Sequence, residues 1–81
     1  MTSVEHEVRA LIAEKLGLKE EDIAGDASIV GDLGADSLDA IEMVIALEGK
    51  FGLVIPDEEA MQIGTVRQAV EYIRRAIESR P

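Results

Sequence analysis

Apolar residues recur at helical spacing near both ends of the chain, with polar residues at most of the positions between them. In the N-terminal segment the apolar positions are Val4, Val8, Leu11, Ile12 and Leu16. In the C-terminal segment they are Val66, Ala69, Val70, Ile73 and Ile77. Apolar positions three and four residues apart form one stripe along an α-helix. We therefore predict amphipathic helices over residues 3–16 and after Thr65, each burying one face.

Helix-capping signals support these two boundaries. Thr2 with Glu5, and Thr65 with Gln68, have the spacing of a capping box, in which each side chain accepts a hydrogen bond from the backbone of the other residue. Gly17 suits the left-handed residue that ends many helices.

A third apolar segment starts near Asp36 or Ser37 and runs to about Phe51. Its apolar positions nearly encircle the predicted helix, and they are Leu38, Ile41, Val44, Ile45, Leu47 and Phe51. A chain of 81 residues buries only about 60 to 65% of the surface that its unfolded form exposes, so it cannot cover a helix on all sides. We expect the excess apolar surface to meet a partner or a ligand.

The segments between these helices are rich in glycine and acidic residues. Residues 17–36 contain four glycines and no alternation long enough for a strand, which predicts a long ordered loop packed on the bundle. Pro56 and Asp57 can open a short helix through about Gln62, because proline is tolerated beside a helix start. The prediction for residues 1–81 is one all-α domain, a four-helix bundle with three longer helices and one short one.

Charge and composition argue against several classes of partner. The net charge is −9, and such a surface repels phosphate backbones, so we expect neither nucleic acid nor anionic membranes as partners. Between Glu20 and Ile63, twelve acidic residues stand against the single base Lys50, which favours basic partner proteins, although an acidic face is often only a solvated surface. No apolar run approaches the roughly 18 to 20 residues of a membrane span, and no secretory signal is evident. We expect a monomeric cytoplasmic protein.

Candidate catalytic and metal-binding residues are few. The chain has no cysteine and one histidine, His6, which we expect at the surface of the first helix. No catalytic triad can be assembled, so an enzyme is not expected. Residues 26–36 lack the spacing of an EF-hand loop. Two groups of carboxylates offer at most weak binding of divalent cations, and they are Asp32, Asp36 and Asp39, and Glu48, Asp57 and Glu58.

The most specific feature of the sequence is a glycine-rich string that precedes the central helix. It reads Gly31-Asp32-Leu33-Gly34-Ala35-Asp36-Ser37-Leu38-Asp39. The plain interpretation of Asp36 or Ser37 is a helix cap. The whole string, however, resembles the attachment motif of acyl carrier proteins. The resemblance continues through residues 42–48, 51–52, 55–60 and 65–73, so it covers nearly the whole chain.

The resemblance implies that Ser37 is the attachment residue for 4′-phosphopantetheine, which a phosphopantetheinyl transferase moves from coenzyme A to the serine hydroxyl. The arm would carry acyl groups as thioesters and would supply the thiol that the chain lacks. A serine in the first turn of a helix holds its phosphodiester near unpaired N–H groups and the positive end of the helix dipole. Asp36 and Asp39 oppose that charge, so we expect them to serve recognition by the transferase.

The resemblance also implies an acyl pocket and a docking face. The positions that match the family's acyl lining are Ile29, Val30, Leu33, Val44, Leu47, Ile55, Ala60 and Ile63. Each of these is equally well explained as ordinary core. The residues expected to meet partner enzymes are Asp36, Leu38, Asp39, Ile41, Glu42, Ile45 and Glu48. Apolar contacts framed by carboxylates would give weak, steered encounters with basic docking patches.

Some positions depart from the fatty-acid carriers of that family. They are Ile29, where an aromatic residue is frequent, and Gly49-Lys50, Val54 and Met61-Gln62, where acidic or other charged residues are usual. We expect an acyl carrier that serves acyl-transferring and fatty acid synthase enzymes, with a polyketide or other secondary lipid pathway as the alternative. A rival of another class, an unmodified acidic adaptor or metal-binding bundle, predicts no change at Ser37.

Overall fold

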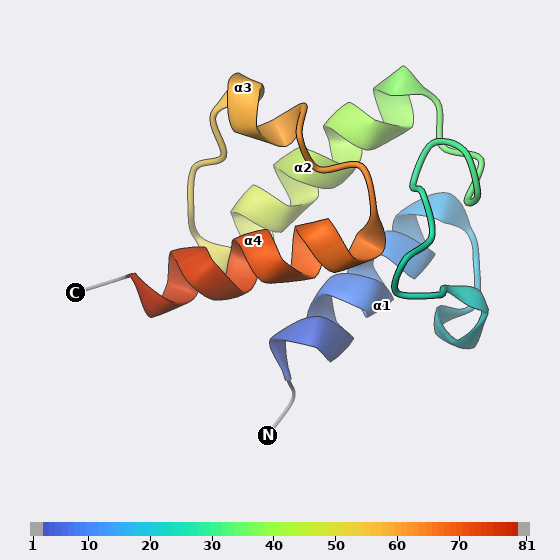
Figure 1. Ribbon diagram of the computed structural model, residues 1–81, viewed down its shortest axis with the longest axis horizontal. Coiled ribbons are helices and arrows are strands. Elements are labelled where there is room, and N and C mark those ends of the chain that lie inside the picture. Colours follow the sequence, from blue (N-terminus) through green and yellow to red (C-terminus); the bar gives the residue numbers. More distant parts are fainter. Residues whose placement is uncertain (1–2, 80–81) are drawn as a thin grey trace.

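The computed structural model describes residues 3–79, which form a bundle of helices (Figure 1). In chain order the elements are α1 (Val4–Leu16), the 3₁₀ turn η1 (Glu20–Asp22), α2 (Ser37–Phe51), α3 (Asp57–Ala60) and α4 (Val66–Glu78). The described part of the chain contains no strand, only an isolated bridge between Ser28 and Thr65. The predicted all-α bundle of three longer helices and one short helix is confirmed.

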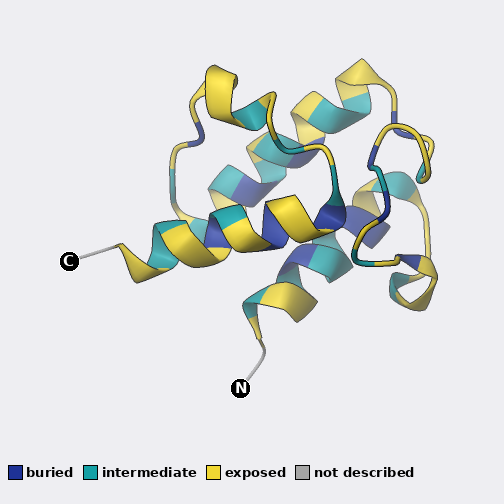
Figure 2. Ribbon diagram, viewed as in Figure 1, coloured by how far each residue is buried: buried dark blue, intermediate teal, exposed yellow. Residues whose placement is uncertain are grey.

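The core lies where α1 packs against both α2 and α4 (Figure 2). Six large side chains are almost fully buried there, and they are Val8, Ile12, Ile23, Leu47, Val66 and Ile73. Burying an aliphatic side chain of this size stabilises the folded state by about 1.5 to 3 kcal/mol. The two terminal helices contribute four of the six, as their apolar stripes predict.

The first helix begins one residue later than the predicted capping box implies. Ser3 is the N-cap, and its hydroxyl accepts a 3.1 Å hydrogen bond from the backbone N–H of His6. The predicted box of Thr2 and Glu5 is therefore replaced by a serine cap, and Thr2 lies outside the described residues. At the other end, Gly17 adopts φ 69°, the left-handed conformation predicted for it.

The two later helices differ in how closely they follow their sequence signals. Thr65 and Gln68 form the predicted capping box of α4, with reciprocal bonds of 3.1 and 3.0 Å. The short helix α3 ends at Ala60 rather than at Gln62. Beyond Ala60 the chain tightens into bonds that span three residues, from the N–H of Gln62 to Glu59 and from that of Ile63 to Ala60, so the α-helical pattern stops.

The loop between α1 and α2 is fastened to the start of α4. The N–H groups of Val66 and Arg67 donate to the carbonyls of Ala27 and Gly25, at 3.1 and 2.7 Å, and the N–H of Ile29 donates to the carbonyl of Gly64 at 2.9 Å. The first two bonds satisfy backbone N–H groups that the first turn of α4 leaves without partners inside the helix. The long loop is thus ordered by backbone bonds as well as by buried apolar side chains.

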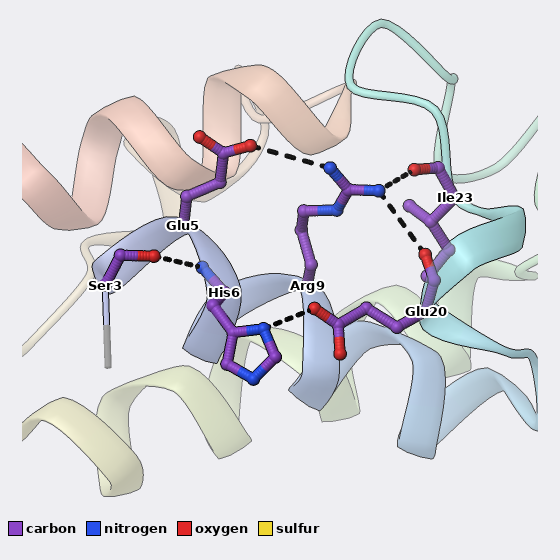
Figure 3. Close-up of polar contacts among 6 residues, drawn as sticks. All are labelled: Ser3, Glu5, His6, Arg9, Glu20 and Ile23. Carbon is purple, nitrogen blue, oxygen red and sulfur yellow. Dashed lines mark hydrogen bonds and ion pairs between the residues drawn. The ribbon is translucent and has the colours of Figure 1, made fainter. Parts of the chain in front are cut away.

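Arg9 fastens the other end of this loop to α1 (Figure 3). Its Nη2 donates to the carbonyl oxygens of Ile23 and of Glu20, the latter at 3.3 Å, while Nη1 pairs with Glu5 at 3.5 Å. His6 lies exposed beside it, and its Nδ1 is 2.7 Å from a carboxylate oxygen of Glu20. The bonds to carbonyls hold η1 against α1, whereas exposed ion pairs of this kind contribute little stability.

None of the helices described for residues 3–79 is both long enough and apolar enough to cross a membrane.

Candidate functional site at the start of helix α2

The start of α2 is fixed by a reciprocal pair of aspartates. Asp36 is the N-cap, and its carboxylate accepts a 2.8 Å hydrogen bond from the N–H of Asp39. The carboxylate of Asp39 accepts in return from the N–H of Asp36 at 3.2 Å. Ser37 is consequently the first residue of the helix. The two carboxylates that the sequence analysis assigned to recognition therefore also hold the helix start in place.

The glycine-rich lead positions Ser37 at the surface. Gly34 adopts φ 75°, a left-handed conformation that favours glycine, and no atom lies within 4 Å of where a Cβ would be. The next residue, Ala35, is buried, and its N–H donates to the carbonyl of Ile29 at 3.2 Å. The chain is thus anchored in the core two residues before Ser37, whose own side chain is exposed.

A groove of about 580 Å³ begins at Ser37 and follows α2 toward α3. Its wall on α2 consists of Ser37, Ala40, Ile41, Val44, Ile45 and Glu48, which recur at helical spacing. Its other wall consists of Val30, Ile55, Asp57, Ala60 and Met61. Most of these side chains are apolar, and the groove is open to solvent. It is therefore suited to a flexible apolar group that is attached at Ser37.

Only half of the predicted acyl-pocket residues line the groove, and one of these, Ile55, also belongs to the buried core. Val30, Val44, Ile55 and Ala60 line the groove. Ile29 and Leu47 are buried in the core, and Leu33 and Ile63 pack against the core while remaining partly exposed. Leu47 lies on the side of α2 that faces the core, like Met43, whereas Val44 lies on the side that faces the groove. Sequence matching missed Ala40 and Met61, although Ala40 has the helical spacing from Ser37 that marks this wall.

The predicted docking residues share a surface but differ in exposure. Leu38, Ile41 and Ile45 expose 61%, 56% and 60% of their surface, and Glu42 is also exposed. Glu48 is only partly exposed, and its Oε2 accepts a 2.8 Å hydrogen bond from the N–H of Ile55. Glu48 therefore holds the loop after α2 as well as lining the groove.

Further exposed apolar side chains lie on the segments around α2. They are Val30, Val54 and Met61. Val54 and Met61 stand at positions where the sequence analysis noted a departure from charged residues. Together with the exposed side of α2, they make this part of the molecule the place where most large apolar side chains remain uncovered by the fold.

The α3 wall of the groove is connected to α4 through Tyr72. Burial raises the pKa of the Tyr72 phenol, and the carboxylate of Glu59, which accepts its hydrogen bond, raises that pKa further, with a smaller effect from Glu48. The neutral phenol is the form that donates this bond. Tyr72 thereby links α4 to the short helix that carries Ala60.

The two groups of carboxylates considered for divalent cations do not converge. Within residues 3–79 no group of three or more acidic or histidine side chains is arranged to hold a metal ion. Several of these carboxylates instead accept backbone hydrogen bonds. Asp32 accepts from the N–H of Ser28 at 2.8 Å, Asp36 and Asp39 cap α2, and Glu48 accepts from Ile55.

An exposed serine that opens a helix beside an apolar groove, in a protein without cysteine, is the arrangement expected of a carrier domain with a covalently attached arm. A family model described as the phosphopantetheine attachment site matches residues 6–73, which is most of the chain. The chain belongs to this family. It is a phosphopantetheine-carrier protein of the acyl carrier type, and domains of this kind are generally non-catalytic. The group that it bears is covalently bound 4′-phosphopantetheine, and a phosphopantetheinyl transferase and partner enzymes interact with it.

The start of α2 fits such a group. Ser37 is exposed, and there is open space where a Cβ on Gly34 would be. The first turn of a helix leaves backbone N–H groups without intrahelical partners, and the helix dipole adds positive potential there, so a phosphodiester is favoured. The carboxylates of Asp36 and Asp39 reduce that advantage, but both are already held by backbone N–H groups.

Proposed function

We propose that Ser37 is the residue that bears the arm and that the protein carries acyl intermediates to enzymes of fatty acid biosynthesis. The observation that carries this proposal is the position of Ser37, exposed at the first residue of α2 and at one end of the apolar groove. The bound arm supplies a terminal thiol that holds acyl groups as thioesters.

Comparison of the four serines favours Ser37. The hydroxyl of Ser3 caps α1, that of Ser28 accepts from the N–H of Gly31 at 3.0 Å, and that of Ser79 donates to the carbonyl of Arg75 at 2.9 Å. Each of these three hydroxyls already forms a hydrogen bond with the backbone. Ser37 combines an exposed hydroxyl with the attachment motif and with the groove.

The surface around Ser37 supports a shuttle between enzymes. Leu38, Ile41 and Ile45 offer a small apolar contact, and Glu42 adds an exposed carboxylate that can meet arginine or lysine on a partner. A small interface with steering charges gives rapid encounter and rapid release, which repeated transfer between enzymes requires. The apolar walls of the groove suit a hydrocarbon chain, which favours fatty acyl groups over strongly polar ones.

Intact mass spectrometry tests the attachment residue. The wild-type protein, Ser37→Ala and the control Ser79→Ala are incubated with coenzyme A, magnesium and a phosphopantetheinyl transferase of broad specificity. We expect the mass of one phosphopantetheine to be added to the wild type and to Ser79→Ala, and none to Ser37→Ala. Circular dichroism should show the same helicity for all three. Modification of Ser37→Ala would place the arm elsewhere.

A second assay tests the pathway. The carrier that bears the arm is offered with its thiol free to a malonyl transferase, and as an acyl thioester to a fatty acid ketosynthase. Turnover with both supports fatty acid synthesis. Failure with both, when the mass shows full loading, would favour a carrier for a polyketide or another secondary lipid pathway.

A further inference from the structure

The groove beside Ser37 is lined mostly by apolar side chains, but two carboxylates, those of Glu48 and Asp57, are also part of its lining. Glu48 lies eleven residues after Ser37 on the same side of α2, which corresponds to about 16 Å along the helix axis. Its Oε2 is held by the N–H of Ile55 at 2.8 Å. Asp57, the first residue of α3, lines the opposite wall. No lysine or arginine is among the described residues that line this groove.

These charges act differently on chains with different free ends. An uncharged hydrocarbon chain gains from leaving water for the apolar walls and is indifferent to the carboxylates. A chain that ends in a carboxylate loses hydration on entering the apolar groove and also meets two like charges on its walls, which repel it. The groove lining offers it no cation in compensation.

We propose that Glu48 and Asp57 make this groove selective for acyl chains with an uncharged free end and keep out chains that end in a carboxylate. This inference rests on the proposed function, because it takes the groove as the resting place of the acyl chain carried on Ser37. Uncharged chains are then sheltered along α2, whereas the chains of dicarboxylic acids remain outside the groove and accessible to partner enzymes.

Thermal unfolding of loaded carriers tests the selectivity. The transferase loads the wild-type protein from synthetic coenzyme A thioesters with octanoyl, suberoyl or the methyl ester of suberoyl, and intact mass confirms each product. Relative to the unacylated arm, we expect the octanoyl and methyl ester forms to raise Tm by about 4 °C or more. The suberoyl form, with its free carboxylate, should leave Tm within about 1 °C.

Three variants assign the effect to particular residues. Asp57→Asn and Glu48→Gln remove the charges in the groove and keep side chains of similar shape. Glu58→Gln removes an exposed charge from the same short helix but outside the groove lining. The quantity compared is the difference in Tm between octanoyl and suberoyl forms within each variant, so any effect on basal stability cancels. We expect this difference to fall to about half of the wild-type value or less in the first two variants and to be unchanged in Glu58→Gln.

Each contrary outcome has a distinct meaning. Equal stabilisation by octanoyl and suberoyl, or no stabilisation by octanoyl in a fully loaded protein, overturns the selectivity while leaving attachment at Ser37 intact. If the Tm difference between octanoyl and suberoyl forms equals the wild-type value in all three variants, the exclusion is due to desolvation alone. That result also overturns the role of Glu48 and Asp57. Absence of any mass increase instead overturns attachment at Ser37, and this inference with it.

Discussion

Helices α2 and α4 have similar lengths and start with similar capping boxes, but they use their apolar residues differently. In α4 the apolar stripe faces inward and buries Val66, Ala69, Val70 and Ile73. In α2 only Met43 and Leu47 are buried, while Leu38, Ile41 and Ile45 each remain more than half exposed. Folding accounts for the apolar residues of α4 but leaves these three on α2 largely uncovered.

This difference separates the structural and functional parts of the molecule. Apolar side chains that stay more than half exposed gain less from folding than buried ones, and a group of them on one side of α2 is typical of an interaction site. The groove at Ser37 and the proposed docking surface on α2 would account for this group of side chains. Experiments on matched positions of the two helices can therefore test this difference.

The largest expected effect compares a buried isoleucine of α4 with an exposed one of α2. Ile73 is fully buried, so Ile73→Ala should lower the free energy of unfolding by about 2 to 5 kcal/mol through lost burial and the cavity left behind. Ile45→Ala should lower it by less than about 1 kcal/mol. Urea denaturation followed by circular dichroism measures both. A comparable loss in Ile45→Ala would show that the outer side of α2 belongs to the core.

Removing the N-cap of either helix should lower stability by a similar amount. Asp36→Ala and Thr65→Ala each remove an N-cap, so each should lower the free energy of unfolding by about 1 kcal/mol. Only Asp36→Ala should also slow the addition of phosphopantetheine, because Asp36 sets the start of the helix that presents Ser37. The rate comes from a time course of intact mass. Equal rates for the two variants would argue that the cap of α2 serves stability alone.

Charge reversal on the two helices tests electrostatic steering. Glu42→Lys on α2 should weaken productive encounter with a basic partner enzyme on the order of tenfold at low salt, and less at high salt, because ions screen the attraction. Glu71→Lys, an exposed glutamate of α4, is the matched control and should have a smaller effect. Association rates at two ionic strengths provide the measurement. A loss in Glu42→Lys that is independent of salt would point to direct contact rather than steering.

The smallest effect concerns the link between α4 and α3. The pKa of Tyr72 is raised in the folded protein, so its neutral form is favoured and stability is fully present below the ordinary tyrosine pKa of about 10. Stability should fall as pH rises from that value through the higher folded pKa. Tyr72 is the only tyrosine, so phenolate absorbance reports it alone. Tyr72→Phe should flatten the alkaline decline, and an unchanged decline would assign it to other groups.

Local signals located the helices well and some of their ends less well. Apolar spacing predicted α1, α2 and α4. The structure confirms the capping box of Thr65 and Gln68 and the left-handed conformation of Gly17. The predicted position of the α1 N-cap was wrong by one residue, because serine and threonine are both good N-caps and the sequence places them side by side. The extent of α3 was overestimated, because a helix of one turn depends on its surroundings more than on its own propensity.

The site divides along a similar line. Residue identity and spacing were enough to predict the apolar excess of the central helix, the absence of a thiol and the serine within its motif, since each is a property of one stretch of sequence. It takes the packing of the elements to show which acyl-pocket candidates line the groove and which fill the core, and Ile55 does both. The packing also places a carboxylate oxygen of Glu48 against the N–H of Ile55 and brings Glu48 and Asp57 into the lining of one groove. Those facts depend on how α2, α3 and the long loop pack, and packing joins residues whose separation in the chain says nothing of their distance in space.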